Sequence, residues 1–364
     1  MSHKACRAVG LAQADLIHGI RYGAGHKRSA IQPDEPPFVD TPRHDTHPRT
    51  MPRVIGLLFS GQGAQQVGMG KDLSQHYATA ANMFSEADRR LQRSVSQVAF
   101  AGPIEELTRT ANCQVALYIH GLALWEVLRE ELGAFTFHAA AGLSLGEFTA
   151  HGAAGTFDFG TGLQLVDARS RLMEEACLST VGAMAAFVGG DEAAVLEIAR
   201  EADVDVANLN SPGQIVLSGA TDHIQAAINL AKEKGVRRAV SLNVAGAFHS
   251  RLMASARTQL IPILERADIR SPGPIVVANV TAAPVKEPAD IRQTLADQVT
   301  GSVRWVETVT YLLDKVGCDL LIELGPGQVL AGLVTRIRKG TEVISIENLA
   351  TLQDALPLIR AATA

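Results

Sequence analysis

The stretch TFHAAAGLSLGEFTAHGAA, residues 136–154, joins an apolar run, a Gly-x-Ser-x-Gly pattern and a helix-forming run in direct succession. An apolar run that breaks into a helix just after Ser144 is typical of a nucleophile elbow, a sharp strand-to-helix turn that exposes a serine hydroxyl at the edge of a sheet. The same context puts the backbone N–H of Leu145 at a helix N-terminus, where an oxyanion can be held. The alternative is a glycine-rich turn that carries an incidental serine.

On both sides of this stretch, apolar runs that end in glycine alternate with helical patterns, which predicts an α/β fold with a mostly parallel sheet. RVIGLLF at 53–59 predicts the first strand, and SGQGAQ at 60–65 predicts the turn after it. Because parallel strands end at the same edge of a sheet, we expect this turn to lie beside the elbow. Further strands are expected near 136–142, 275–279 and 319–324, and a helical region over 71–131.

The segment 182–244 has a different pattern, in which apolar runs and helical periods follow the order βαββαβ. This order predicts a ferredoxin-like subdomain inserted into a larger α/β-hydrolase-like domain. The large domain would then be discontinuous, over 51–181 and 245–350. Residues 1–50 hold five of the fifteen prolines and no sustained apolar period, which predicts a disordered N-terminal extension or an artefact of start-site choice before Met51.

The bulk composition excludes several classes of protein. The formal charge of −5 and the isoelectric point of about 6.1 give no global basic field for nucleic acid or an anionic membrane. The four cysteines form no CxxC pair, which argues against a zinc site or a disulfide framework and for a reducing compartment, so we expect a cytoplasmic protein. The longest mostly apolar stretch, 182–190, is far shorter than the roughly 20 residues of a membrane span, and no signal-peptide pattern opens the chain.

A serine nucleophile needs a base, and histidine has a pKa suited to that role near neutral pH. His249 is the best candidate because it lies in the turn-like AGAFHS at 245–250, where the subdomain ends and the large domain resumes. The alternative is an ordinary surface-loop histidine. His151 is only one helix away from Ser144 and is expected to point along that helix rather than back at the hydroxyl.

Arg169 lies at the centre of an apolar helical stripe. On a helix over 163–176, a step of 100° per residue places on the same side five apolar residues, Leu165, Val166, Leu172, Met173 and Ala176. A guanidinium in such a stripe needs an anion or many acceptors, because stranding it there is very costly. The position of Arg169 therefore predicts either a structural ion pair with a protein carboxylate or a bidentate clamp for a substrate carboxylate.

From about residue 54 to 340 the chain resembles the malonyl-CoA:acyl carrier protein transacylase family, whose members also occur as acyltransferase domains of polyketide synthases. The resemblance rests on seven motifs that follow one another in the expected order. The motifs are FSGQGAQ at 59–65, GLSLGE at 142–147, LVDARSRLM at 165–173, NLNSPGQIVLSG at 208–219, GAFHS at 246–250, QVTGSVRW at 298–305 and ELGPG at 323–327. The resemblance implies Ser144 as nucleophile, His249 as general base and acid, and Arg169 as the group that binds the malonyl carboxylate. It also implies that Gln298 orients His249 through its main-chain carbonyl, in place of the aspartate of a Ser-His-Asp triad.

By the same resemblance, Gln62 and the Leu145 N–H line the oxyanion hole. Phe248 resembles the residue of polyketide acyltransferases that take malonyl rather than methylmalonyl groups. Two positions depart from the family pattern: many members have histidine where this chain has Leu143, and proline where it has Ser60.

The implied reaction moves a malonyl group from malonyl-CoA to the phosphopantetheine thiol of an acyl carrier protein, with no metal and no other cofactor. A proofreading acyl hydrolase and a non-catalytic carrier-binding module remain alternatives. An ordinary α/β-hydrolase is disfavoured because its histidine comes late in the chain, whereas 115 residues follow His249, the last histidine here. Two basic clusters are candidate docking surfaces for the acidic carrier protein: Lys232, Lys234, Arg237 and Arg238, and Arg336, Arg338 and Lys339.

Overall fold

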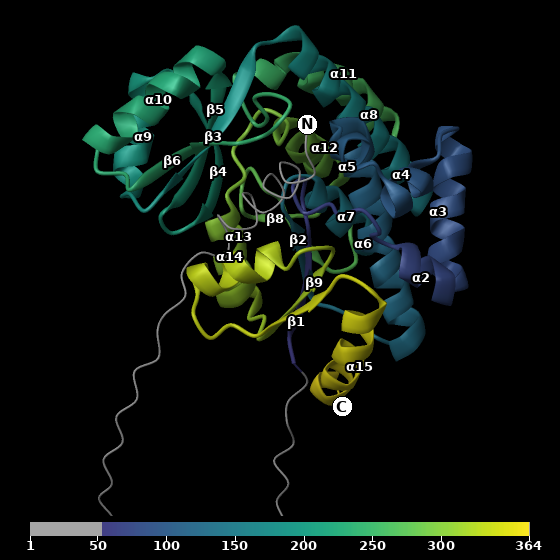
Figure 1. Cartoon of the computed structure of the whole chain (residues 1–364). Helices are drawn as coiled ribbons and strands as arrows, with labels where there is room; N and C mark the ends of the chain where they lie inside the picture. Colours follow the sequence, from purple (N-terminus) through teal and green to yellow (C-terminus); the bar gives the residue numbers. More distant parts are fainter. Residues whose placement is uncertain (1–52, 364) are drawn as a thin grey trace, which may run out of the picture.

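The computed structural model describes residues 53–363, so the predicted extension over 1–50 lies outside the described residues. Its larger sheet has six strands in the order β10-β9-β1-β2-β7-β8, and Figure 1 labels β1, β2, β8 and β9 of this sheet. All neighbouring strands run parallel except β7 and β8, which are antiparallel. The strands are β1 (Ile55–Phe59), β2 (Ala139–Gly142), β7 (Ile275–Val277), β8 (Pro284–Val285), β9 (Leu320–Leu324) and β10 (Val343–Ile346). The chain therefore has the α/β fold with a mostly parallel sheet that the alternating pattern predicts.

The strand register aligns three glycine-containing turns at one edge. Phe59 pairs with Gly142 on one side and with Leu324 on the other. The turn after β1, the elbow after β2 and the Gly-Pro-Gly turn after β9 therefore leave the sheet at the same level. The expectation that the turn after the first strand lies beside the elbow is confirmed, since a Cβ built on Gly61 would lie 2.4 Å from the Leu143 carbonyl oxygen.

Helices cover both faces of the large sheet because its strands are apolar on both sides. Leu57 faces a core shared with α6, α7, α8 and α11, whereas Leu58 faces a second core with α13 and α14. The helices of this unit are α2 (Lys71–His76), α3 (Ala78–Leu91), α4 (Val95–Ala101), α5 (Ile104–Thr108), α6 (Thr110–Leu132), α7 (Leu145–Ala153), α8 (Phe159–Ser179), α11 (Ala254–Arg266), α12 (Pro288–Asp297), α13 (Trp305–Tyr311), α14 (Val329–Ile337) and α15 (Leu349–Thr363).

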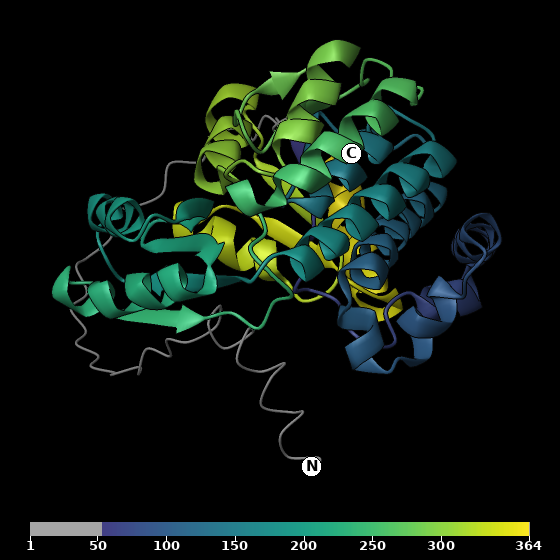
Figure 2. The same ribbon diagram turned by 90° about the horizontal axis from the view of Figure 1, so that it is seen from above.

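The segment that follows α8 forms a second, antiparallel sheet of order β4-β5-β3-β6, which stands apart from the large sheet in Figure 2. Its elements are β3 (Gly182–Val188), α9 (Glu192–Glu201), β4 (Asp205–Ser211), β5 (Gln214–Ala220), α10 (Thr221–Glu233) and β6 (Arg238–Ser241). It has its own apolar core, in which Phe187, Ile198 and Leu217 are buried. A parallel bridge between Asn208 and Val303 ties it to the large unit.

Element ends differ from the sequence-based expectations in a few places. The helical region expected over 71–131 is divided into five helices, and one of the breaks falls at Gly102 and Pro103. The terminal β10 and α15 were not predicted, and α15 runs past residue 350, where the expected large domain ends. No helix within residues 53–363 is long and apolar enough to span a bilayer.

Candidate active site

The turn between β2 and α7 places Ser144 at the carboxyl edge of the large sheet. Ser144 has φ 55° and ψ −103°, a backbone conformation that L-residues rarely adopt. The two flanking glycines are required by space: a Cβ on Gly142 would lie 2.0 Å from the Gly146 carbonyl carbon, and one on Gly146 would lie 2.1 Å from the Phe59 carbonyl oxygen. The Gly-x-Ser-x-Gly pattern is therefore a sharp strand-to-helix turn.

Asn279, two residues after β7, holds the elbow from the neighbouring strand. Its Oδ1 accepts the Ser144 N–H at 2.7 Å, and its Nδ2 donates to the Gly142 carbonyl at 2.8 Å. Asn279 is fully buried, so both bonds are shielded from water. One side chain thus fixes the main chain on both sides of Leu143, directly before the strained serine.

His249 lies within hydrogen-bonding distance of Ser144, with 2.8 Å between its Nε2 and the serine Oγ. Its Nδ1 lies 2.8 Å from the Gln298 carbonyl oxygen and 3.2 Å from that of Gly301. Because carbonyl oxygens only accept, Nδ1 carries the proton, and Nε2 is left to accept the hydroxyl proton of Ser144. His151 points elsewhere, as expected: its Nδ1 lies 2.9 Å from Thr156 Oγ1.

The surroundings keep His249 neutral. Burial and the positive charge of Arg169 lower its pKa to about 4, against the opposing effect of the two carbonyls. A neutral imidazole near physiological pH is the form that takes a proton from a serine.

Arg169, on α8, is fully buried and lies against Ser144. Its Nη2 donates to Ser144 Oγ at 3.0 Å and to Gln298 Oε1 at 2.6 Å, and its Nη1 donates to Gln114 Oε1 at 2.5 Å. All three partners are neutral. Burial lowers the pKa of Arg169 to about 10, which leaves it charged at neutral pH. Its guanidinium also lies over the Phe148 ring, with 5.4 Å between Cζ and the ring centroid.

The charge of Glu147 acts on this arginine, and the Glu147 carboxylate is hydrogen-bonded to Gln298, one of the partners of Arg169. Its Oε2 accepts from Gln298 Nε2 at 2.7 Å and from the Asn279 N–H at 3.0 Å. Gln298 Nε2 also donates to the Ser144 carbonyl at 3.0 Å. Burial raises the pKa of Glu147 to about 7, against the opposing effect of these hydrogen bonds and of Arg169.

The remaining predicted site residues lie around this centre. Leu145 is the first residue of α7, so its N–H is at the positive end of the helix beside Ser144. Gln62 reaches the site through Gln114, with 3.3 Å between Gln114 Nε2 and Gln62 Oε1. Phe248 precedes His249 and is buried with 6% of its surface exposed.

Three site residues were missed in the sequence: Gln114, Glu147 and Asn279. Each is a buried polar residue in an apolar context, the same signal that singled out Arg169. Gln114 lies in α6, which is apolar on nearly every side. Asn279 closes the apolar run 275–279, and Glu147 ends the GLSLGE motif itself.

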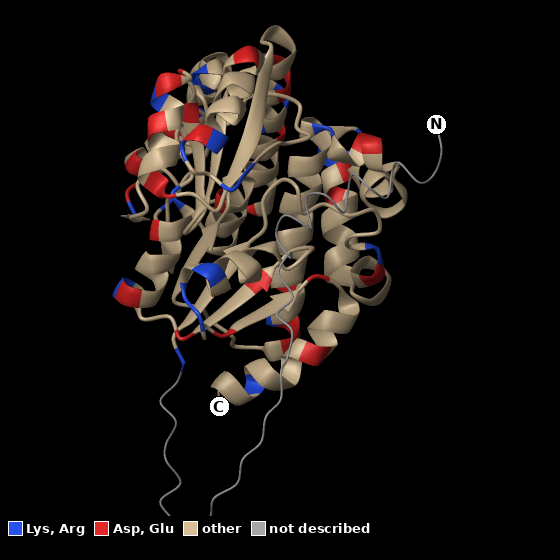
Figure 3. Ribbon diagram, turned by 60° about the vertical axis from the view of Figure 1, so that its left-hand side comes forward, with Lys and Arg blue, Asp and Glu red and all other residues tan. Residues whose placement is uncertain are grey.

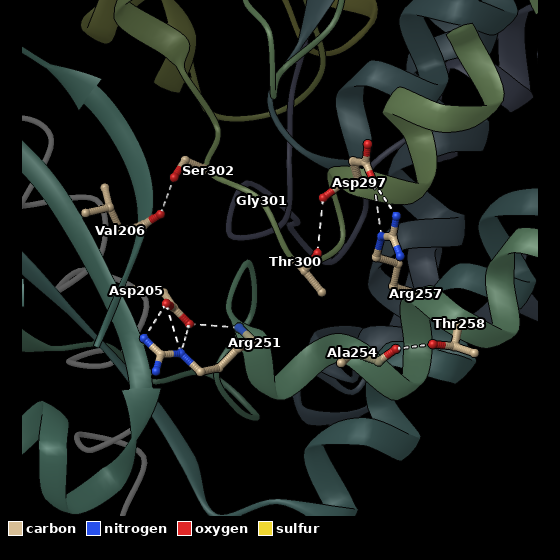
Figure 4. Close-up of a pocket in the computed structure, with 10 residues that line it drawn as sticks. All are labelled: Asp205, Val206, Arg251, Ala254, Arg257, Thr258, Asp297, Thr300, Gly301 and Ser302. Atoms are coloured by element: carbon tan, nitrogen blue, oxygen red, sulfur yellow. Dashed lines mark hydrogen bonds and ion pairs between the residues drawn. The ribbon is translucent and has the colours of Figure 1, made fainter. Parts of the chain in front are cut away.

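A separate cavity of about 600 Å³ lies between β4, α11 and the loop after α12 (Figure 4). Two ion pairs line it: Arg251 with Asp205 at 2.8 Å, and Arg257 with Asp297 at 2.5 Å. Gly301 belongs both to its wall and to the carbonyl pair at His249. Within residues 53–363, no group of three or more histidine, cysteine, aspartate or glutamate side chains is placed to hold a metal ion.

Comparisons with a family model, with curated relatives and with solved structures all indicate the same protein family. Residues 57–351 match the model of the acyl transferase domain. The chain is 38% identical to the malonyl CoA-acyl carrier protein transacylase of Bacillus subtilis over 311 residues, 84% of this chain and 97% of the relative.

Two solved structures are similar over nearly their whole length. The acyl-carrier-protein S-malonyltransferase of Bartonella henselae superposes with a TM-score of 0.80 at 36% identity, covering 84% of this chain and 99% of that one. A malonyl-transacylase solved in complex with its type II polyketide synthase acyl-carrier protein gives 0.79 at 35% identity, with coverage of 84% and 99%. The chain therefore belongs to the malonyl CoA-acyl carrier protein transacylase family of acyl transferases.

Proposed function

We propose that this protein transfers the malonyl group of malonyl-CoA to the phosphopantetheine thiol of an acyl carrier protein through a malonyl-serine intermediate. One observation carries the proposal: Ser144 Oγ lies between His249 Nε2, at 2.8 Å, and the guanidinium of Arg169, at 3.0 Å. A serine-histidine pair alone suits any acyl transfer. A buried arginine bonded only to neutral groups suits an acyl group that brings its own carboxylate.

In the first half-reaction, His249 Nε2 takes the hydroxyl proton as Ser144 Oγ attacks the thioester carbonyl carbon. The bond from Oγ to that carbon forms, the bond from carbon to sulfur breaks, and His249 returns the proton to the departing thiolate. Coenzyme A leaves as the thiol, and the malonyl group remains as an ester on Ser144. The carbonyls of Gln298 and Gly301 hold the ring in the required tautomer throughout.

The second half-reaction reverses these roles on a different thiol. His249 deprotonates the phosphopantetheine thiol, whose sulfur attacks the ester carbon, and the proton passes to the Ser144 oxygen as it departs. One thioester replaces another, so the free-energy change is small and the chemistry requires neither a metal nor a redox cofactor.

The charge that develops on the carbonyl oxygen in both steps would be held by the Leu145 N–H at the N-terminus of α7, with Gln62 completing the oxyanion hole. The malonyl carboxylate would bind Arg169, which then places the thioester over Ser144. The Phe248 ring beside the base would leave no room for an α-methyl group and so exclude methylmalonyl-CoA.

Intact-mass measurement tests the proposal. The protein is incubated with malonyl-CoA, and then with phosphopantetheinylated carrier protein. We expect one malonyl group on the enzyme, which moves to the carrier when the carrier is added. Release of free malonate without transfer would indicate a proofreading hydrolase, and absence of any adduct would indicate a non-catalytic carrier-binding module.

We also propose that 182–244 is a ferredoxin-like subdomain inserted in an α/β-hydrolase-like large domain. The element order β3-α9-β4-β5-α10-β6 and the strand order β4-β5-β3-β6 support this description. A cytoplasmic location is proposed with it. Three cysteines in the described part of the chain, Cys113, Cys177 and Cys318, are free buried thiols, which suits a reducing compartment.

A further inference from the structure

The buried carboxyl group whose charge acts on Arg169, that of Glu147, does not contact the guanidinium through any described hydrogen bond. The three hydrogen-bond partners of Arg169 are uncharged, and Glu147 lies beyond one of them, Gln298. Glu147 and Arg169 are both fully buried, so the interaction between their charges is weakly screened. A carboxylate placed directly on Arg169 would occupy the guanidinium, whereas one placed behind Gln298 leaves it available.

The Gln298 amide has only one orientation that satisfies its neighbours. One end faces two acceptors, the Ser144 carbonyl and Glu147 Oε2, and therefore must be the NH₂ group. The other end faces Arg169 Nη2, a donor, and therefore must be the carbonyl oxygen. The carboxylate form of Glu147 can only accept hydrogen bonds, so it favours the orientation that turns the Gln298 NH₂ group toward it.

We infer that Glu147 is a positioning residue for malonyl selectivity: by fixing the Gln298 amide with its oxygen toward Arg169, it holds the guanidinium where a substrate carboxylate meets it. This inference rests on the proposed function. The Glu147 carboxylate makes no described hydrogen bond to Ser144 or His249, so it acts through Gln298 rather than on the reacting atoms.

The geometry separates this role from one in proton transfer. His249 is bonded to the main-chain carbonyl of Gln298, and the N–H of the same planar peptide group, that of Val299, donates to the Ala296 carbonyl at 3.2 Å in the last turn of α12. A change at Glu147 therefore disturbs the side-chain amide of Gln298 more than the base. The expected kinetic effect is a higher KM for malonyl-CoA with a smaller change in kcat, and little change for acetyl-CoA.

The substitution Glu147→Gln keeps the size and shape of the side chain and replaces the carboxylate with a neutral amide. Whichever way the new amide turns, its NH₂ group meets either two donors, Gln298 Nε2 and the Asn279 N–H, or the buried space at Oε1, where the structure gives no acceptor. A buried donor without a partner weakens the network, so the ratio of kcat/KM for malonyl-CoA to that for acetyl-CoA should fall roughly tenfold.

Glu323→Gln is the matched control. Glu323 is also a fully buried carboxylate, but it accepts the N–H groups of Leu330 and Ala331 at the start of α14. Its loss should lower the melting temperature and leave the ratio of the two specificity constants unchanged.

A double-mutant cycle tests the route of the effect. In an Arg169→Ala background, Glu147→Gln should change the ratio no further, because its influence passes through the arginine. Gln298→Met removes the amide that links Glu147 to Arg169 and keeps Glu147. It should lower the ratio of the two specificity constants as Glu147→Gln does, and it replaces that variant in the test if Glu147→Gln fails to fold.

Three results would overturn the inference: an unchanged ratio in a folded Glu147→Gln or Gln298→Met protein, an equal loss for both substrates, or a rise in the ratio. A rise would mean that Glu147 only weakens the field of Arg169. Failure of the proposed function is distinguished by the wild-type protein, which in the intact-mass assay would then form no malonyl adduct or would pass no malonyl group to carrier protein.

Discussion

Ser144 and His249, 105 residues apart in the chain, meet at 2.8 Å between the serine hydroxyl oxygen and the histidine Nε2. Ser144 comes from the elbow after β2, and His249 from the segment that returns the chain from the small sheet to the large one. Both have positive φ, 55° and 56°, so the main chain is constrained at each partner. The contact depends on the two units being packed together.

Replacing Ser144 with alanine should abolish both the malonyl adduct and transfer to carrier protein. Removal of a serine nucleophile typically lowers kcat by at least about 10⁴-fold. Ser170→Ala is a suitable control, because Ser170 is a buried serine next to Arg169 whose hydroxyl donates to the Asp167 carbonyl. Intact-mass measurement after incubation with malonyl-CoA detects the adduct on either variant. An adduct on Ser144→Ala at the wild-type level would contradict the assignment of Ser144 as the nucleophile.

The pH dependence of acylation should reflect a histidine with a low pKa. Burial and Arg169 lower the pKa of His249 to about 4, so the neutral form prevails above that pH. The activity needs the neutral base, and therefore kcat/KM should stay level down to about pH 5 and fall as pH drops through 4. Arg169→Ala removes a positive charge and should move the midpoint upward. Rapid-quench acylation from about pH 3 to 8 measures this midpoint. A wild-type midpoint at the ordinary histidine value of about 6.5 would refute the prediction.

Arg169→Ala should shift preference from malonyl-CoA toward acetyl-CoA, because only the malonyl group loses an ion pair. Truncating one partner of a buried charged pair costs about 2–5 kcal/mol, so the ratio of specificity constants should fall by about 30-fold to several thousand-fold. Arg171→Ala on the same helix is the control, since Arg171 is 57% exposed and paired with Asp167. An unchanged ratio in a folded Arg169→Ala protein would make this arginine structural.

Gly146→Ala should disturb the elbow through space alone. The added Cβ would lie 2.1 Å from the Phe59 carbonyl oxygen, so β1 or α7 must move. Overpacking of this kind costs about 1–3 kcal/mol, and the shift should also slow acylation. Gly273→Ala is the comparison, because its Cβ would meet only the Ala154 carbonyl oxygen at 3.8 Å. Thermal unfolding of the two variants checks the prediction; equal melting temperatures would argue against it.

Carrier-protein docking should depend on the basic cluster of the small subdomain. Basic and acidic residues are interspersed along the ribbon of this region in Figure 3, and Lys234 is already paired with Glu197 and Glu201. Charge reversal at Lys232, Arg237 and Arg238 should raise the KM for carrier protein, leave that for malonyl-CoA nearly unchanged and flatten the salt dependence of transfer.

The second basic cluster provides the comparison for docking. Arg338 is paired with Asp314, and Arg336 donates to Gln214 at 2.8 Å, so two of the three side chains already have partners. Reversal there should affect carrier-protein kinetics less. If neither set of reversals changes the KM for carrier protein, docking does not depend on these charges.

The sequence by itself determined the elements that local pattern controls. Strand and helix order follow from apolar periodicity, and the Gly-x-Ser-x-Gly turn follows from the need for close approach at Gly142 and Gly146. Arg169 was recognisable because a charge in an apolar stripe needs a partner wherever the helix packs. Each of these signals lies within one element, so it can be read without knowing the fold.

Only the tertiary structure decided which groups meet. Gln114, Glu147, Asn279 and Gln298 come from four separate segments, and no local pattern states that Glu147 lies behind Gln298 rather than against Arg169. Burial then sets their chemistry: the same desolvation lowers the pKa of His249 to about 4 and raises that of Glu147 to about 7. Residue types are fixed by the sequence, but their distances and dielectric surroundings arise only when the sheet, its helices and the inserted segment pack around them.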